Sequence, residues 1–410
     1  MEFSVITLGC KVNEYESQSM ISQLEKAGYE VVEGLQPADF YILNSCAVTN
    51  IAERKSRQTI AKILKLNVDA KILVCGCASQ VNLHQFEQYK NVVAIMGVHG
   101  KHNIVEYLNQ NGLLDLPVKY YNLPYAKNTQ ARQYIKIQDG CNNFCTYCVI
   151  PYARGRSRSR DLKDVLEEIK NTSTSEIVIT GIDVSDYRID GKLALIDLLE
   201  EVDKLGKRFR ISSIECTIIT KEFLERLSKC TNFCPFFHIS MQSASNGTLK
   251  RMNRKYTIEK FIDTCNLVKE IFPNACISTD IIVGFKQESD DEFNETVENI
   301  KKIPFSFMHV FPYSEKKGTV AEKMTGDVPK NVVKEREKVL IQLSDEFYDK
   351  FLQGNIGKTH KVLVEEVKDG FSVGYTENYV YTYINKELPV GIYEVVAKDK
   401  YKDGLVAELI

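Results

Sequence analysis

The amino-acid sequence predicts an α/β protein made of three consecutive units: an open parallel α/β sheet, a partial (β/α)6 barrel of the TIM type, and a small all-β module. Two observations lead to this prediction. Short β-rich runs alternate with helical patterns along most of the chain, and the alternation ends after one long helical pattern. The length of 410 residues exceeds one typical domain core, so two or three domains are expected.

The first unit, residues 1–112, is predicted to be the open parallel sheet, because helical patterns such as "EYESQSMISQLEKAG" separate its β-rich runs. Ligands of such sheets bind outside the carboxyl ends of the strands. Cys10, Cys46 and Cys77 each stand at such an end, so we expect these three distant thiols to converge. The expected strands are residues 3–9, 40–46, 71–77 and 92–98.

The second unit, residues 127–353, follows a stretch with prolines and no periodicity that is typical of a linker (112–132). Six strand candidates with helical segments between them resemble a TIM-type barrel that lacks two β/α units. An incomplete barrel leaves an open side where a large substrate can enter. The expected strands are residues 134–138, 176–181, 209–215, 236–242, 276–285 and 307–313.

The last unit, residues 354–410, begins where the helical pattern "KNVVKEREKVLIQLSDEFYDKFLQGNIG" reaches a glycine-rich turn. Beyond Gly357 the pattern changes to short β-rich runs separated by turns, such as "GFSVGYTENYVYTYI". These features predict a small all-β module.

Composition excludes some classes of protein. The net charge of −2 provides no global field for a polyanion, so a nucleic-acid surface must be a local patch. No apolar run reaches the ~20 residues of a membrane span, and "MEFSVITLGC" has no signal-peptide pattern, so we expect a cytoplasmic protein. Twelve cysteines in such a chain indicate metal ligation or catalysis rather than disulfides.

The stretch "YIKIQDGCNNFCTYCVIPYARGR" places Cys141, Cys145 and Cys148 close together after the first barrel strand. A zinc site needs four closing ligands, and no histidine stands nearby in the sequence. A ferredoxin cluster normally takes four local cysteines, whereas an iron–sulfur cube with three keeps one iron open. The spacing favours the open cube, with a zinc knuckle or unrelated cysteines as the alternatives.

This CxxxCxxC loop, with Tyr147 before its last cysteine, resembles the radical S-adenosylmethionine (SAM) superfamily. The resemblance implies a [4Fe–4S] cluster on Cys141, Cys145 and Cys148 whose open iron binds the amine and carboxylate of SAM. Cleavage of SAM by one electron would then give a 5'-deoxyadenosyl radical.

The upstream segments "TLGCKVNEYES", "ILNSCAVTN" and "VCGCASQ" resemble the methylthiotransferase family within that superfamily. The resemblance implies a second, auxiliary [4Fe–4S] cluster on Cys10, Cys46 and Cys77, and it identifies the tail as a TRAM-like domain. Cys75 would share a strand face with Cys77. We favour Cys77 as the ligand, because its Gly-Cys pair matches the family, and expect Cys75 to be buried.

The phrases "GCKVNEYES", "SIECTIIT" and "MHVFPYSEKKGT" look most like the threonylcarbamoyladenosine tRNA branch. This resemblance implies methylthiolation at C2 of N6-threonylcarbamoyladenosine beside the tRNA anticodon, with one SAM as methyl donor and a second as radical source. The alternatives are isopentenyl-adenosine in tRNA, a ribosomal-protein side chain, or a non-enzymatic iron–sulfur RNA-binding protein. The chain departs from the family at Cys216, where proline is usual, and at "GFKQES", which replaces "GFPGET".

Further SAM or substrate contacts are expected at the carboxyl ends of the barrel strands. Asp280 could equally cap a helix or pair with an arginine. The residues that the resemblance indicates are Tyr147, Thr180, Gly181, Glu215, Gln242, Ser243 and Asp280.

Basic residues after the cysteine loop and in "LKRMNRKY" are candidates for contact with RNA phosphates. In an extended segment the alternating arginines of "YARGRSRSRD" would share one side, where they bind phosphate or the SAM carboxylate, or are solvated or internally paired. The candidates are Arg154, Arg156, Arg158, Lys250, Arg251 and Arg254.

The resemblance also implies partners: the anticodon stem-loop of tRNA, bound in part by the tail, and an electron donor such as flavodoxin or ferredoxin. We expect a monomer. The tyrosines of the tail either stack on bases or form one packed strand face; they are Tyr375, Tyr379, Tyr381 and Tyr383.

Overall fold

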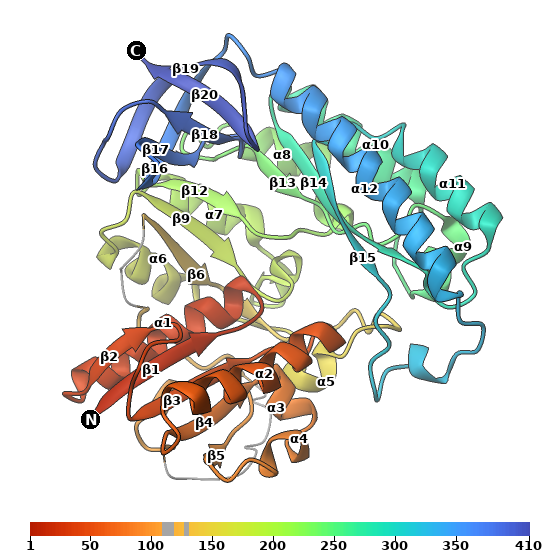
Figure 1. Ribbon diagram of the computed structural model, residues 1–410. Coiled ribbons are helices and arrows are strands. Elements are labelled where there is room, and N and C mark those ends of the chain that lie inside the picture. Colours follow the sequence, from red (N-terminus) through yellow and green to blue (C-terminus); the bar gives the residue numbers. More distant parts are fainter. Residues whose placement is uncertain (109–118, 127–130) are drawn as a thin grey trace.

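The computed structural model describes residues 1–108, 119–126 and 131–410. Figure 1 shows the N-terminal sheet at one end, the yellow-to-cyan partial barrel in the middle, and a small blue β-barrel at the other end. The boundaries expected at residues 112 and 127, and much of the linker between them, lie outside the described residues. No helix in the described ranges is both long and apolar enough to span a membrane.

The N-terminal sheet is parallel throughout, with the strand order β2-β1-β3-β4-β5. The prediction of four parallel strands is confirmed, and one edge strand, β2, was not expected. Helices cover both faces, since α1 packs on Phe3 and Leu73 whereas α2 packs on Tyr41 and Ile72. The elements are β1 Glu2–Thr7, α1 Lys11–Lys26, β2 Glu30–Glu33, β3 Phe40–Ser45, α2 Asn50–Leu66, β4 Lys71–Gly76, α3 Cys77–Val81, α4 His84–Glu87 and β5 Val92–Ile95.

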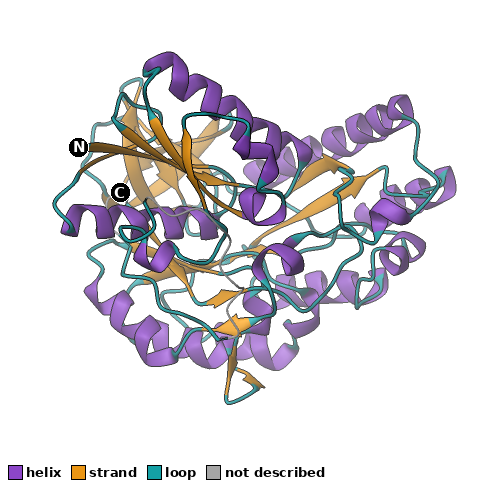
Figure 2. Cartoon of the chain, turned by 90° about the horizontal axis from the view of Figure 1, so that it is seen from below, coloured by secondary structure: helices purple, strands orange, loops and turns teal. Residues whose placement is uncertain are grey.

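The central unit is a partial barrel of six parallel strands in sequence order, as predicted (Figures 1 and 2). Two three-stranded sheets form it, and isolated bridges join Phe209 to Phe233 and Ile214 to Ile239 between them. The strands are β6 Arg132–Lys136, β9 Glu176–Thr180, β12 Arg208–Ile211, β13 Phe236–His238, β14 Cys276–Val283 and β15 Phe307–Pro312.

Helices cover the outer face of these strands. Alternate strand residues such as Ile135, Ile177 and Phe237 pack under the helices, so the residues between them face the interior of the barrel, which we call the lumen. The helices that cover this face are α6 Leu162–Asn171, α7 Leu195–Asp203, α8 Lys221–Leu227, α10 Ile258–Ile271, α11 Asp290–Ile300 and α12 Lys330–Gln353.

Shorter elements lie at the carboxyl edge of the barrel and in the loops between its strands. They are β7 Gln138–Asp139, α5 Ile150–Arg154, β8 Arg158–Ser159, β10 Arg188–Ile189, β11 Lys192–Leu193 and α9 Asn246–Arg251, with short 3-10 turns at residues 101–103, 184–186, 216–218 and 321–323.

The tail is a closed five-stranded barrel with the order β16-β17-β18-β20-β19, which confirms the predicted all-β module. Its backbone accepts hydrogen bonds from Arg208 and Arg210 of β12. Tyr379 stacks between Phe236 of β13 and Tyr375, with ring centroids 4.3 and 4.5 Å apart, so this tyrosine belongs to a packed face. The strands are β16 Thr359–Lys368, β17 Phe371–Tyr375, β18 Tyr381–Ile384, β19 Gly391–Tyr401 and β20 Gly404–Leu409.

Candidate functional site

The cysteine loop after β7 is held in a tight turn at the carboxyl edge of the barrel. Gly140 has a φ of 74°, and a Cβ there would lie 2.1 Å from the carbonyl oxygen of Arg156, so only glycine fits. The backbone N–H of Cys141 donates to Gly155, and that of Cys148 donates to Cys145. These contacts place three half-buried thiols on one compact loop.

Two of these sulfur atoms each accept a hydrogen bond. Nη1 of Arg254 donates to Sγ of Cys145 across 3.4 Å, and the N–H of Asn143 donates to Sγ of Cys141 across 3.4 Å. Burial raises the pKa of Cys148 to about 12 and raises the pKa of Cys141 as well. Because a thiolate is the form that binds metal, the donors stabilise a state that burial alone disfavours.

Cys10, Cys46 and Cys77 follow the neighbouring strands β1, β3 and β4, and they converge as the topology predicts. Gly9 has a φ of 105°, and a Cβ there would come within 2.7 Å of Sγ of Cys46, so glycine permits this close approach. Burial raises the pKa of Cys46 to about 11, and Cys77 and Cys10 both lie close enough to act on it electrostatically. The sheet edge therefore collects a second set of three thiols.

The expectation that Cys75 shares a face with Cys77 is wrong. Gly76, with a φ of 103°, turns the chain after β4, and Cys77 becomes the first residue of α3. Cys75 packs in the core under α1, whereas Cys77 packs on the opposite face of the sheet. Cys75 is fully buried, so its thiol is enclosed in the core on the α1 side of the sheet.

The two cysteine sets lie near each other. Val149 and Ala153, directly after the barrel cysteines, pack in the same apolar cluster as Cys77. The Cys77 thiol is also close enough to Cys148 to raise its pKa. The two sets therefore lie at one junction between the N-terminal unit and the barrel.

Neither cysteine set is arranged for a single zinc ion. Tetrahedral zinc with bonds of about 2.3 Å would hold its thiolates about 3.8 Å apart. In the described ranges, one group of His, Cys, Asp or Glu residues has ligand atoms within 4.8 Å of one another, and that group contains no cysteine. The sulfur atoms of each cysteine set are therefore farther apart than one zinc ion requires, and this wider spacing fits a larger iron–sulfur cube.

The charges around Cys77 fit an anionic cluster. Nε of Arg154 donates to Sγ of Cys77 across 3.2 Å, in a fully buried ion network that joins α1 to the barrel. This network holds more cations than carboxylates, so a negative charge on the Cys77 side would balance it. Its members are Glu16, Lys101, Lys136, Asp139, Arg154 and Arg158.

The structure places most of the expected SAM-contact residues at the carboxyl ends of barrel strands. Thr180 ends β9 and Gly181 follows it, while Glu215 accepts two hydrogen bonds from Nη2 of Arg254, at 2.8 and 2.6 Å. Gln242, with a φ of 71°, binds the backbone of β14. Ser243 is buried close by.

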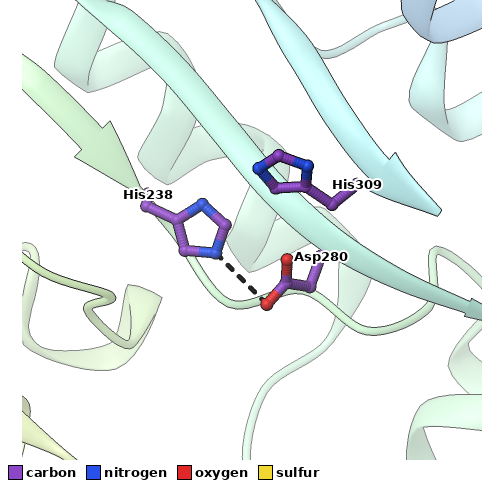
Figure 3. A group of neighbouring side chains, drawn as sticks. All are labelled: His238, Asp280 and His309. Carbon is purple, nitrogen blue, oxygen red and sulfur yellow. Dashed lines mark ion pairs between the residues drawn. The ribbon is translucent and has the colours of Figure 1, made fainter. Parts of the chain in front are cut away.

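Two of the expected residues have other surroundings. Tyr147, within the cysteine loop, packs edge-on against Phe285, with ring centroids 6.3 Å apart. Asp280 neither caps a helix nor pairs with an arginine in the described contacts, because it pairs with His238 at 3.3 Å (Figure 3).

Sequence reasoning missed His238 and His309, which lie in the lumen beside Asp280. A period-two count along the expected strands places both on the face that Asp280 shares, and this signal was available. Asp183 was also missed: it accepts hydrogen bonds from Asn143 and Cys141, and its pKa is raised to about 6 by burial and by Glu215.

The expected basic stripe does not form. Arg154 ends α5 and Arg158 begins β8, so the segment is not extended, and both side chains are buried with Asp139 as a partner. These two residues match the internally paired alternative. Arg156 alone of the three is exposed, 4.3 Å above the Phe144 ring.

The second basic group also divides. Lys250 is exposed on α9, whereas Arg251 pairs with Glu292 at 2.6 Å. Arg254 belongs to the cysteine site through Cys145 and Glu215, so it is not part of a surface patch.

Comparison with known proteins agrees with this geometry. The model of the Radical SAM superfamily matches residues 135–300, and that of the uncharacterized protein family UPF0004 matches residues 2–97. The solved structure of the radical S-adenosylmethionine methyltransferase TsrM from Kitasatospora setae is 13% identical, with a TM-score of 0.56 over 76% of this chain and 74% of that chain. The radical enzyme OxsB is 14% identical, with a TM-score of 0.51 over 85% of this chain and 56% of that chain. Both likenesses show the fold.

Curated relatives cover nearly the whole chain. The threonylcarbamoyladenosine tRNA methylthiotransferase MtaB of Bacillus subtilis is 38% identical, over 91% of this chain and 88% of its own. The protein of the same name from Thermotoga maritima is 40% identical, over 91% and 89%. The tRNA-2-methylthio-N(6)-dimethylallyladenosine synthase of Protochlamydia amoebophila is 34% identical, over 89% and 85%. This chain therefore belongs to the radical SAM methylthiotransferase family, in the branch of the threonylcarbamoyladenosine tRNA methylthiotransferases.

Proposed function

We propose that this protein inserts a methylthio group at C2 of N6-threonylcarbamoyladenosine beside the anticodon of tRNA, with one SAM as methyl donor and a second as radical source. The observation that carries the proposal is the convergence of two separate sets of three thiols at neighbouring edges of two parallel sheets. The substrate follows from the names of the relatives. Residues 1–112, 127–353 and 354–410 would carry the auxiliary cluster, the SAM site and an RNA contact, respectively.

Cys141, Cys145 and Cys148 would hold one [4Fe–4S] cluster and Cys10, Cys46 and Cys77 the other. When bound, the two clusters and SAM supply the radical and sulfur chemistry that an unactivated aromatic C–H requires and that acid–base side chains cannot provide.

The protein's own residues would position these groups. Arg254 stabilises the Cys145 thiolate with one nitrogen and holds Glu215 at the lumen edge with the other. Arg154, a member of the buried ion network, stabilises the Cys77 thiolate in the same way. Thr180, Gly181, Gln242 and the nearby carboxylates would orient SAM, because they stand at the strand ends where such folds gather their polar groups.

RNA contact would come from the exposed cations beside the site. Arg156 and Lys250 are solvent-accessible near the cysteine loop and can reach phosphates. The target base must leave the anticodon stack to enter the lumen, which costs a few kcal/mol. We further propose that the protein acts in the cytoplasm as a monomer and receives electrons from a flavodoxin or ferredoxin.

Mass spectrometry of tRNA nucleosides tests the substrate. Cells that lack the gene should lose 2-methylthio-N6-threonylcarbamoyladenosine and accumulate its unmethylthiolated form, and the wild-type gene should restore the product. Unchanged 2-methylthio-threonylcarbamoyladenosine would contradict the proposal. Loss of the methylthio-isopentenyl nucleoside instead would indicate the substrate named for the dimethylallyladenosine relatives.

Anaerobic reconstitution tests whether the protein is an enzyme at all. We expect about eight irons per chain, from two four-iron clusters, and reductive cleavage of SAM to 5'-deoxyadenosine. Iron binding without any SAM cleavage would indicate a non-enzymatic iron–sulfur protein.

A further inference from the structure

Three side chains on neighbouring strands form a polar cluster in the lumen: His238 on β13, Asp280 on β14 and His309 on β15 (Figure 3). Asp280 and His309 are register partners, and the ligand atoms of all three lie within 4.8 Å of one another. Nδ1 of His238 lies 2.9 Å from Oγ of Ser278, which directs its Nε2 toward Asp280, 3.3 Å away. The register of the three strands therefore fixes the positions of these side chains.

The cation of Lys11 lies opposite this cluster, on the N-terminal unit. Lys11 is the first residue of α1 and directly follows Cys10. Its charge acts on both Asp280 and His309, so its side chain reaches the lumen. Lys11 is solvent-accessible and has no hydrogen-bond or ion-pair partner among the residues that the structure describes. An ammonium group without a partner in the described ranges is free to bind an anion held in the lumen.

The balance of charge distinguishes an anion site from a metal site. Two histidines and one carboxylate can bind a divalent cation. Here, however, the single carboxylate is already paired with His238, and Lys11 adds positive charge to the same space. A second cation would meet repulsion from Lys11, whereas a carboxylate would be attracted to it. These charges favour an anionic group that also offers hydrogen-bonding atoms.

We propose that Lys11 binds the carboxylate of an amino-acid substituent on the target adenosine, and that His309 and the His238–Asp280 pair bind its hydroxyl and amide groups. This inference rests on the proposed function. In adenine, C2 and C6 both adjoin N1, so a substituent on N6 lies on the same ring edge as C2. A base with C2 directed at the Cys10 set therefore brings its N6 substituent toward Lys11, the next residue along the chain.

The proposal assigns a discriminating role to Lys11, because a neutral, apolar substituent gains nothing from an ammonium. A charged hydrogen bond typically contributes enough to change affinity by about 10- to 100-fold. We expect that factor to separate a substrate with a carboxylate from one without it.

The test compares two RNA substrates with the reconstituted holoenzyme. Anticodon stem-loops carrying threonylcarbamoyladenosine, or its methyl ester, are assayed for kcat/KM with the wild-type enzyme, with Lys11→Gln and with Lys11→Arg. The wild-type enzyme should prefer the free acid by about 10- to 100-fold. Lys11→Gln should remove most of this preference and Lys11→Arg should keep most of it. Lys26→Gln, at the exposed far end of the same helix, is the matched control.

Iron content is measured for each variant, so that a loading defect beside Cys10 is separated from a recognition defect. If the wild-type enzyme modifies neither RNA, the proposed function fails. If it modifies the free acid and Lys11→Gln keeps the full preference over the ester, this inference alone is overturned. A stoichiometric non-iron metal that His309→Ala removes would also overturn it, because the cluster would then be a cation site.

Discussion

Nε of Arg154 donates to Sγ of Cys77 across 3.2 Å, and the two terminal nitrogens of the same guanidinium contact Glu16, Asn13 and Asp139. Arg154 follows the barrel cysteines along the chain, whereas Cys77, Glu16 and Asn13 belong to the N-terminal unit. One fully buried side chain therefore couples the two thiol sets mechanically and electrostatically.

Replacement of Arg154 by Met should weaken both the mechanical and the electrostatic coupling between the two thiol sets. Glu16 would lose its bidentate partner, and we expect the free energy of unfolding to fall by about 3 kcal/mol, near the lower limit for breaking a buried ion pair, because Lys101 and Lys136 still contact Glu16. The urea midpoint, measured by circular dichroism, checks this. Arg156→Met, an exposed arginine two residues away, should leave the midpoint unchanged; equal effects would contradict the account.

The same substitution should lower the reduction potential of the auxiliary cluster, since it removes a positive charge and a hydrogen bond from a ligating sulfur. Redox titration followed by electron paramagnetic resonance measures this in a chain whose Cys141, Cys145 and Cys148 are all Ala. A potential that does not change, with four irons still bound, would show that Arg154 has no electrostatic role.

Single cysteine variants should separate the two sets. Cys145→Ala should abolish reductive cleavage of SAM, whereas Cys46→Ala should leave cleavage intact and stop formation of the methylthio product. Both variants should lose about half of their iron. The control is Cys75→Ala, whose thiol lies in the core under α1 and should not change the iron content. Product from the Cys46 variant would contradict the assignment of the second set.

Arg254 should matter for SAM cleavage rather than for RNA affinity. Arg254→Met removes the donor to Cys145 and leaves Glu215 without its partner at the lumen edge. Loss of such charged hydrogen bonds is expected to reduce 5'-deoxyadenosine formation by about 10- to 100-fold. Lys255→Met, at the exposed neighbouring position, is the control. If Arg254→Met weakens tRNA binding and leaves SAM cleavage unchanged, its assignment to the cysteine site is wrong.

Local pattern was enough to predict the strands of the barrel and four of the five strands of the N-terminal sheet, because each β-rich run is bounded by turn residues and separated from the next by a helical pattern. It missed β2, whose sequence EVVE is short, charged at both ends and half-exposed at the sheet edge. The convergence of Cys10, Cys46 and Cys77 could also be predicted, since it depends only on strand ends and topology.

Residues whose role depends on distant partners could not be assigned from local sequence. Arg154 looks like a surface cation, and its burial requires Glu16, 138 residues away. Arg254 likewise meets Cys145 across 109 residues. Period-two alternation could have placed the three lumen residues on one face, but their meeting depends on the relative register of three strands, which short β-rich runs leave open.

Glu176 links the barrel to the tail through charge, and this link should depend on pH. The carboxylate is fully buried, which by itself would raise its pKa, but Arg210, Arg132 and Arg208 together lower the pKa from 4.5 to about 2. In the unfolded chain the carboxyl group has its ordinary pKa of 4.5. Between pH 4.5 and about 2 the unfolded state therefore binds more protons than the folded state. Stability from this site is therefore complete above pH 5 and is lost as the pH falls toward 2.

Glu176→Gln should accordingly cost the most at neutral pH. Three guanidiniums, two of them buried, lose their common partner, and we expect the free energy of unfolding to fall by about 3–5 kcal/mol at pH 7. Urea midpoints of the cluster-free wild type and variant should then approach each other as the pH is lowered from 5 to 2. Glu201→Gln, which breaks an exposed pair with Lys204, should show no such trend. A gap between wild type and Glu176→Gln that stays constant with pH would mean that the pKa of Glu176 is the same in the folded and unfolded chain, and that the arginines hold the tail through its backbone carbonyls alone.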